Sequence, residues 1–595
     1  MQASTTLEKY NRGYWLQFYL YKDLENLFVR QGDEAKLRLL NQAYYSGDWS
    51  IIAKKGNEGF YFFSDEDVAA IRSSAKTQWG KKIIADLEQK VKERRKHSLE
   101  VPKEEGGHFH DYFCPVHNLQ FTFRWDKPLA QYCSACDKEW IGNNRYDWAW
   151  IYEVHMLNRD YMYQCMYLYL ATGKRQYADY IRTMLLDYAG KYAGWFEHNS
   201  GRKATDQHSG KAFAQSLDEA NWATKVAMAY MAIKPVLSKE EVKAIEEGYL
   251  QPAATLLLHR PAGANWQMWH NSGLAALGIA LENDSIVDVA INKDKYGYHY
   301  LIGKHKNSDG WINEGSPHYH YYPLEALLFT ANAVKCRGIK LFDKDLHDMF
   351  VEPVKGTYPD LSFPAHSDGW YGANLLSQSA LYEVGNARYN DPFLKRVLEL
   401  TYAQKKRLDP EALLSNQLIK ASEESLLQKS YSFDTSGFCL LRSDTRTVVL
   451  KFGGEGIGHG HPDKLSITIH DGKNELVSDF GTSGYGVPDY LKWYKRTLSH
   501  NTVTVDAKDQ KRSVGKLLKF NPRSDGGYAE AETTTAYPGV RMKRSLDLKG
   551  THLQDVYTCT SDSSHLYEYV ILFNEKPLMD GQPTATTLTG SEVHE

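Results

Sequence analysis

The spacing of the apolar residues changes once along this 595-residue chain, near residue 430. From about residue 60 to about 420, apolar side chains recur every three or four residues, which predicts amphipathic helices. After about residue 430, short runs such as GFCLLRS and KLSITIH alternate apolar and polar residues between turn-forming pairs, which predicts antiparallel strands. The pattern divides the chain into a helical domain at 1–425 and a β domain at 426–595.

Within the helical domain, the segments predicted to be helical are 161–189, 216–233, 238–258 and 265–282. Ser238 with Glu241 spells a capping box, and Thr172-Gly173 is a short break. Repeated helical hairpins of this length favour an α/α toroid, with an irregular helical array as the alternative. In the β domain, KLSITIH-DG-KNELVSDF predicts a hairpin whose two-residue turn pairs Asp479 with Lys464. The chain stops at SEVHE soon after an apparent strand, as a β domain truncated at its C-terminus would.

Composition narrows the function classes. A net charge of −3 argues against bulk nucleic-acid binding, although it leaves room for an anionic polymer in a locally basic cleft. No apolar run approaches the roughly 20 residues of a membrane span. The start, MQASTTLEKY, lacks a basic-then-apolar signal pattern, and seven cysteines do not make a complete disulfide framework. The 41 tyrosines and 14 tryptophans suit both a core and stacking on sugar rings.

One motif has the spacing of a metal site. Cys114-x2-His117 is followed, after fifteen residues, by Cys133-x2-Cys136. Two such pairs supply four ligands for a tetrahedral zinc and leave no open position for catalysis. We therefore predict a structural zinc in an insertion at about 108–140; the alternative is four unrelated loop residues.

A second set of polar residues follows the glycine-rich stretch GGEGIGHGHPD at 453–463. If this stretch forms a short strand, His459 and His461 lie on one side of it. Asp479 and His500 come later, and two imidazoles with one carboxylate suit zinc with a position left for water. The alternative is that these groups only hydrogen-bond to one another.

Two further stretches concentrate aromatic and polar residues. NWQMWHN at 265–271 places Asn265, Trp269 and His270 on a helix, where a buried aromatic face is the alternative. DGWINEGSPHYHYY at 309–322 has more Tyr and His than packing alone requires, although each tyrosine taken singly suits a core.

Together these stretches resemble the heparinase II/III-like polysaccharide lyases, a superfamily that includes exo-acting heparin lyases and oligoalginate lyases. The likeness covers roughly 100–595 and rests on NWQMWHN, EGSPHYHYYPL, HGHPDKLSI, SDFGTSGY and LSHNTVTVD. It implies an α+β multidomain fold, an α/α toroid followed by an antiparallel β-sandwich, with the active site between them. It also implies β-elimination on a uronic-acid polysaccharide, giving a 4,5-unsaturated uronate.

The resemblance implies roles for individual residues. Tyr319 is the candidate general acid, and also the base when proton and leaving group lie on the same side; His459 is the candidate base for the opposite-side geometry. Asn265 or His270 would neutralise the uronate carboxylate, and the sequence leaves that choice open. His461, Asp479 and His500 match metal positions, with zinc the expected ion. The candidates for binding the anionic substrate are Gln215, Arg260, Trp269, Glu314, His318, Lys492 and Arg496, with Lys211 and Lys495.

Heparin or heparan sulfate is the favoured substrate at this point, and alginate or oligoalginate is the alternative. Two other classes remain: a non-catalytic glycan-binding protein, and a glycoside hydrolase using Glu314 and Asp368 as its carboxylate pair. A protein of this kind is expected to be periplasmic or secreted. Endo or exo action and the oligomeric state stay open.

Overall fold

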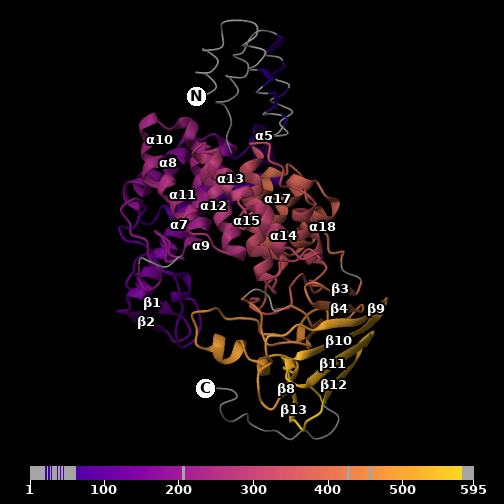
Figure 1. The fold of residues 1–595 in the computed structure, drawn as a ribbon. Helices are drawn as coiled ribbons and strands as arrows, with labels where there is room; N and C mark the ends of the chain where they lie inside the picture. Colours follow the sequence, from indigo (N-terminus) through magenta and orange to yellow (C-terminus); the bar gives the residue numbers. More distant parts are fainter. Residues whose placement is uncertain are drawn as a thin grey trace.

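The computed structural model describes residues 62–203, 208–424, 426, 429–454 and 458–578, with scattered residues between 21 and 45. The helices form one layer and the β-sheets lie below it (Figure 1). Among the described residues, no helix combines the length and the apolar character needed to cross a membrane.

The helical domain is a series of hairpins. The predicted helix at 216–233 is α9, the capping box at Ser238 and Glu241 opens α10, and Gly173, with φ of 69°, ends α7. The helices are α5 (Asp65–Lys76), α6 (Gln78–Arg94), α7 (Asn144–Thr172), α8 (Arg175–Tyr192), α9 (Ser216–Ile233), α10 (Lys239–Ile245), α11 (Gln251–Leu258), α12 (Ala264–Ala280), α13 (Asp284–Asn292), α14 (Tyr298–His305), α15 (His318–Lys335), α16 (Lys344–Val354), α17 (Ser379–Tyr389) and α18 (Pro392–Gln404).

Contacts between these helices run around a ring. Helices α5, α7, α9, α12 and α15 touch in that order, and contacts continue through α16 and α17 to the short turn Pro410–Leu414 and back to α5. Ion pairs stabilise the closure: Asp67 of α5 accepts from Arg388 of α17 at 2.5 Å and from Lys335 of α15 at 3.1 Å. The predicted class, a helical toroid-like domain followed by antiparallel β-sheets, is confirmed.

The β domain consists of sheets with a shared core. A five-stranded sheet has the order β3-β4-β5-β6-β7, a four-stranded sheet has the order β12-β11-β10-β9, and β8 pairs with β13. Leu441 and Leu450 of the first sheet and Met542 and Leu546 of the second belong to one hydrophobic core. The strands are β3 (Tyr431–Phe433), β4 (Phe438–Arg442), β5 (Thr447–Lys451), β6 (Ser466–His470), β7 (Glu475–Val477), β8 (Val503–Val505), β9 (Lys516–Arg523), β10 (Gly526–Tyr537), β11 (Val540–Lys549), β12 (His552–Ser561) and β13 (Tyr567–Tyr569).

The hairpin of β6 and β7 differs from its prediction. His470 pairs with Glu475, so the turn has four residues, and the predicted pairing of Asp479 with Lys464 is wrong. The carboxylate of Asp471 accepts from the backbone N–H groups of Lys473 and Asn474, which stabilises the longer turn. Asp479 therefore lies beyond the end of β7, in the loop that leads away from the sheet.

A small insertion, residues 108–141, lies between α6 and α7, and we call it the knuckle. It contains the hairpin of β1 (Ala130–Cys133) and β2 (Lys138–Ile141) and has its own core around Tyr112 and Phe121. In Figure 1 the hairpin projects below the helical layer, on the side that the β domain occupies.

The ion pairs that close the ring give a stability prediction. Asp67→Asn removes the negative charge but keeps the side-chain shape, leaving two cations near the ring closure without their anion. We expect the free energy of unfolding to fall by about 3 kcal/mol in chemical denaturation followed by circular dichroism. Asp179→Asn, which removes an exposed pair with Arg175, is the control and should change it by less than about 0.5 kcal/mol. Equal losses of unfolding free energy in the two variants would contradict the role given to Asp67 in closing the ring.

Candidate active site

The predicted catalytic tyrosine and histidine meet where the two domains touch. Tyr319 lies in the first turn of α15, and its ring stacks on that of His459 with 3.5 Å between centroids and 15° between planes. His459 and His461 lie in an irregular segment before β6, so the predicted strand with both on one side is wrong. The two histidines lie close together because both bond to the same carboxylate.

That carboxylate belongs to Asp368, which lies between α16 and α17 and is fully buried. Its Oδ1 bonds to Nε2 of His461 at 2.9 Å, and its Oδ2 bonds to Nδ1 of His459 at 3.0 Å. Oδ2 also accepts from the hydroxyls of Tyr485 at 3.1 Å and Tyr490 at 3.0 Å. Burial opposes ionisation, but the hydrogen bonds from the histidines and the nearby Lys495 hold the Asp368 pKa well below its usual range. Asp368 is therefore the anion around which the site is ordered.

Tyr485 joins the predicted acid to this anion. Its hydroxyl lies 2.5 Å from that of Tyr319 and 3.0 Å from Nδ1 of His459. When Tyr485 donates to Asp368, its oxygen accepts from Tyr319. Burial raises the pKa of the Tyr319 hydroxyl above its ordinary value, which keeps the phenol protonated. We call Tyr319, His459, Asp368 and Tyr485 the catalytic cluster.

The two candidates for neutralising a carboxylate occupy different surroundings. Nδ2 of Asn265 donates to Oε2 of Glu314 at 2.6 Å, and the same oxygen lies 3.7 Å from Nε2 of His459. His270 is fully buried near the backbone of Arg260 and Ser216, and burial lowers its pKa to about 4. Asn265 is thus connected to the catalytic cluster through Glu314, whereas the contacts of His270 are with the helical core.

The residues predicted to bind substrate divide into several groups. The His318 ring lies beside Tyr319, with 5.0 Å between centroids, and burial lowers its pKa to about 4. Trp269 is fully buried against Tyr322 and Phe329, so the prediction that it contacts substrate is wrong. Several other polar candidates already have protein partners: Glu314 holds Asn265, Arg260 pairs with Glu197, Arg496 pairs with Asp509, and Lys211 donates to the carbonyl of Ala193. Gln215 lies beside His108. Lys492 is exposed.

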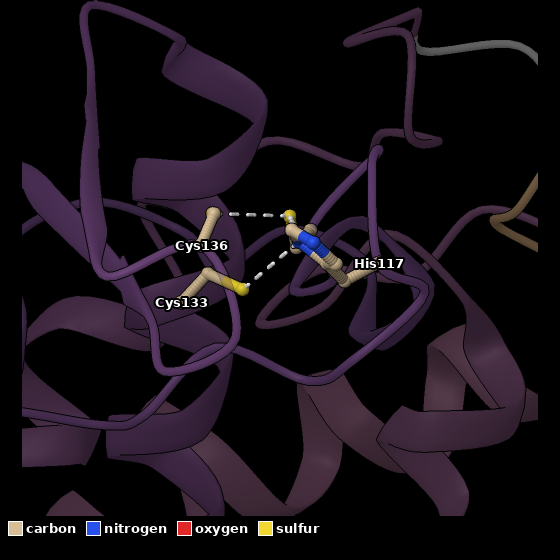
Figure 2. A group of neighbouring side chains, drawn as sticks. His117, Cys133 and Cys136 are labelled. Atoms are coloured by element: carbon tan, nitrogen blue, oxygen red, sulfur yellow. Dashed lines mark hydrogen bonds between the residues drawn. The ribbon is translucent and has the colours of Figure 1, made fainter.

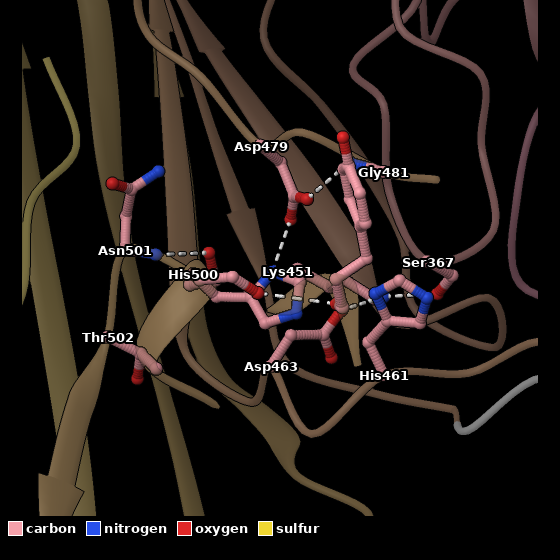
Figure 3. Close-up of polar contacts among 12 residues, drawn as sticks. Ser367, Lys451, His461, Asp463, Asp479, Gly481, His500, Asn501 and Thr502 are labelled. Atoms are coloured by element: carbon pink, nitrogen blue, oxygen red, sulfur yellow. Dashed lines mark hydrogen bonds and ion pairs between the residues drawn. The ribbon is translucent and has the colours of Figure 1, made fainter. Parts of the chain in front are cut away.

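The predicted metal residues of the β domain, His461, Asp479 and His500, lie near one another (Figure 3), and His461 bonds to Asp368 of the catalytic cluster. Nδ1 of His500 bonds to Oδ2 of Asp479 at 3.0 Å. The three side chains whose ligand atoms all lie within 4.8 Å of one another are Asp463, Asp479 and His500, so Asp463 takes the place predicted for His461. His461 turns its Nε2 to Asp368 instead.

Two nitrogens at this site fit a metal. Nδ1 of His461 and Nε2 of His500 are buried, and the structure gives neither a hydrogen-bond partner. A histidine that donates one nitrogen to a carboxylate presents the other as a ligand, which is the usual arrangement around protein-bound metals. Lys451 and Lys464, however, already pair with Asp463 and offset its charge. The ligand atoms that converge are those of Asp463, Asp479 and His500, and the His461 ring lies beside that of His500, with 5.2 Å between centroids.

The knuckle brings its four predicted ligands together, and Figure 2 labels three of them, His117, Cys133 and Cys136. Sγ of Cys114 lies 3.9 Å from Sγ of Cys136 and 3.7 Å from Nδ1 of His117, and Sγ of Cys133 lies 3.8 Å from that nitrogen. Tetrahedral zinc with normal bond lengths separates two sulfurs by about 3.8 Å, and sulfur from nitrogen by about 3.6 Å. A disulfide needs about 2.05 Å. The geometry matches a tetrahedral metal site.

Both halves of the knuckle turn in the same way. The residue after the second ligand of each pair has a left-handed backbone, with φ of 54° at Asn118 and 48° at Asp137. Asn and Asp tolerate this conformation better than other residues with a side chain. The sequence thus encodes the turn as well as the ligands.

Comparisons with known proteins agree with this arrangement. Residues 426–577 match the family described as "Heparinase II/III-like, C-terminal", and residues 154–351 match the family "Alginate lyase". Over these two regions the chain is similar to heparinase II/III-like proteins and to alginate lyases. An "Alginate lyase" of Stenotrophomonas maltophilia is 29% identical over 71% of this chain and 63% of its own length. An "Exo-oligoalginate lyase" of Saccharophagus degradans is 26% identical over 72% and 64%, so the chain spans less than two thirds of either relative.

More distant likenesses concern heparin-degrading proteins. A "Heparin-sulfate lyase" of Bacteroides stercoris is 26% identical over 40% of this chain and 35% of its own length. The crystal structure titled "Crystal Structure of Heparinase III" superimposes with a TM-score of 0.50 at 14% identity, covering 69% of this chain and 63% of that one. This superposition shows a likeness of fold.

The role of Asp368 predicts the effect of removing its charge. Asp368→Asn keeps the shape but places an amide among four donors, so we expect unfolding to become easier by about 3 kcal/mol in urea denaturation. Asp360→Asn, eight residues earlier with a side chain 41% exposed, is the control and should cost less than about 1 kcal/mol. If both variants unfold at the same denaturant concentration, Asp368 does not order the site.

Proposed function

We propose that this protein is a polysaccharide lyase that cleaves a uronic-acid polymer by β-elimination. The observation that carries the proposal is the contact of Tyr319 with His459 and, through Tyr485, with Asp368. The family matches at 154–351 and 426–577 support it, because both are lyase families and the cluster uses residues from each region.

The reaction requires a base, an acid and an electrophilic group. A base removes the proton from C5, next to the uronate carboxylate, and an acid protonates the departing O4. Tyr319 is protonated and suits the acid. His459 has a lone pair on Nε2 when its Nδ1–H donates to Asp368, which suits a base. Because the two rings are stacked, both can act on one sugar.

Asn265 is the better candidate for offsetting the charge that develops on the carboxylate. Glu314 accepts one of the two hydrogens on Nδ2 of Asn265. The second hydrogen of that amide is available to a ligand. His270 is less suited, because it is enclosed in the helical core. Glu314 then has a positioning role.

A glycoside hydrolase is less well supported. Glu314 and Asp368 would have to flank the scissile bond. The His459 ring lies between them, with Nε2 3.7 Å from Glu314 and Nδ1 3.0 Å from Asp368. A sugar therefore has no room between the two carboxylates. A non-catalytic glycan-binding protein would not need a phenol and an imidazole tied to one buried anion.

Alginate or its oligosaccharides are the first substrates to test. The two relatives that match over about seven tenths of this chain are named alginate lyases. Arg260 and Arg496, which a sulfated polymer would need, are already paired with carboxylates. Heparan sulfate, favoured by the overall sequence likeness, is the second substrate in the test. A periplasmic or secreted location would suit either polymer.

Tyr319→Phe removes one hydroxyl, so we expect kcat to fall by about 10²–10⁴-fold without loss of stability. The measurement is the near-ultraviolet absorbance of the C4–C5 double bond, with alginate, heparan sulfate, chondroitin and hyaluronan as substrates. Tyr321→Phe is the matched control on the same helix, because its hydroxyl bonds to that of Tyr382 in the core. Unchanged turnover of Tyr319→Phe on the best substrate would remove this residue from the mechanism.

We also propose that both metal sites bind zinc. The metal of the knuckle would contribute folding energy. A metal held by Asp463, Asp479 and His500, the set that replaces the predicted one, would hold the β-domain segment that carries His459. Protein purified without chelator should contain about two zinc ions per chain, and Cys133→Ser and Asp479→Asn should each lose about one. A wild type without zinc in elemental analysis contradicts both sites, and a variant that keeps all its zinc contradicts the site it alters.

A further inference from the structure

The knuckle touches the catalytic cluster as well as the helical domain. The β-domain segment 481–490, which we call the tyrosine loop, carries Tyr485 and Tyr490. On the knuckle side, the ring of His110 packs edge-on against that of Tyr485, with 5.1 Å between centroids and 83° between planes. Nδ2 of Asn118, the residue after the ligand His117, donates to Oδ2 of Asp489 at 3.0 Å.

The backbones of the two segments also lie close together. A Cβ atom on Gly486 would lie 2.2 Å from the carbonyl oxygen of His110, so only glycine allows this approach. On its other side the tyrosine loop meets the Asp368 segment, where Thr482 N donates to Gly369 O at 3.0 Å. The loop is therefore held from two sides, and one of these is the knuckle.

The knuckle is anchored to the helical domain. Gly107 N donates to Trp148 O at 2.7 Å, and Ala214 N donates to Gly107 O at 3.1 Å. Arg145, at the start of α7, pairs with Asp111 at 2.6 Å. The segment from 106 to 118 thus runs from the helices to the tyrosine loop.

The knuckle has little of its own to keep it folded. Its two strands have four residues each, and two of the four buried residues that it contributes to its core are the ligands Cys114 and Cys133. A core of this size needs a metal or another covalent link to hold one conformation.

From these contacts we propose that the metal in the knuckle positions Tyr485. The metal keeps the knuckle folded, and the folded knuckle holds the tyrosine loop so that Tyr485 stays bonded to Tyr319 and Asp368. Only the kinetic test of this inference rests on the proposed lyase function. His110 is a positioning residue in this account, since it acts through Tyr485.

The first test removes one ligand. Cys136→Ser should lose zinc and increase hydrogen–deuterium exchange in residues 481–490, while the exchange of α12 and α15 stays unchanged. We expect kcat to fall about tenfold with KM changed less than about threefold. Cys559→Ser, a half-buried cysteine of β12 outside the knuckle, is the control and should change none of these quantities. Loss of zinc without added exchange in the tyrosine loop would overturn the proposal.

A double-mutant cycle separates positioning from general stability. In a Tyr485→Phe background, Cys136→Ser should lower kcat by less than about twofold, because the hydroxyl that the knuckle positions is already absent. A tenfold fall in both backgrounds would show that the knuckle acts by another route. If the wild type cleaves none of the polymers by elimination, the lyase proposal fails. Zinc content and hydrogen–deuterium exchange still test whether the knuckle positions Tyr485.

A second variant covers the case in which Cys136→Ser disrupts the helices. His110→Ala leaves all four ligands in place, so zinc should be retained. We expect the same local increase in exchange and the same non-additivity with Tyr485→Phe. If His110→Ala changes neither exchange nor kcat, the knuckle does not position Tyr485.

Discussion

One buried negative charge organises the junction of the two domains. Asp368 comes from the helical half of the chain and is fully removed from water. A buried carboxylate is costly unless hydrogen bonds and positive charge surround it. Here the partners come from the β domain: His459, His461, Tyr485 and Tyr490. Satisfying this one anion therefore brings the proposed acid, the proposed base and the two domains together.

The close approach of two loops makes this arrangement possible. Gly481 has φ of 58°, and a Cβ atom there would lie 1.9 Å from the carbonyl oxygen of Gly369. The helical ring supplies the other side of the site, with Tyr319 on α15 and Asn265 at the start of α12. The Asp67 ion pairs that close the ring lie in a different part of the domain, so ring stability and site geometry can be tested separately.

The sequence predicted those features that depend on residues close together in the chain. The helix at 216–233 follows from its apolar spacing, and the knuckle ligands follow from their paired spacing. The resemblance predicted Tyr319 and His459, which the structure brings into contact. Asp368 has no such local signal, because its role depends on partners as distant as Tyr490, 122 residues away. Tyr485 ended a quoted motif, but only the fold shows that its hydroxyl reaches Tyr319. Trp269 was misjudged because α12 is buried on nearly all sides, so the helical pattern could not distinguish a cleft face from a core face.

The central claim is that the catalytic cluster performs elimination and adds no water. Mass spectrometry of the products from the best polymer tests this most directly, because elimination gives a new non-reducing end that is one water lighter than the hydrolysis product. The account predicts a C4–C5 double bond at every new non-reducing end, while the piece that keeps the original non-reducing end has the same mass in both reactions. New non-reducing ends that carry an added water would identify a hydrolase and contradict the roles given to Tyr319 and His459.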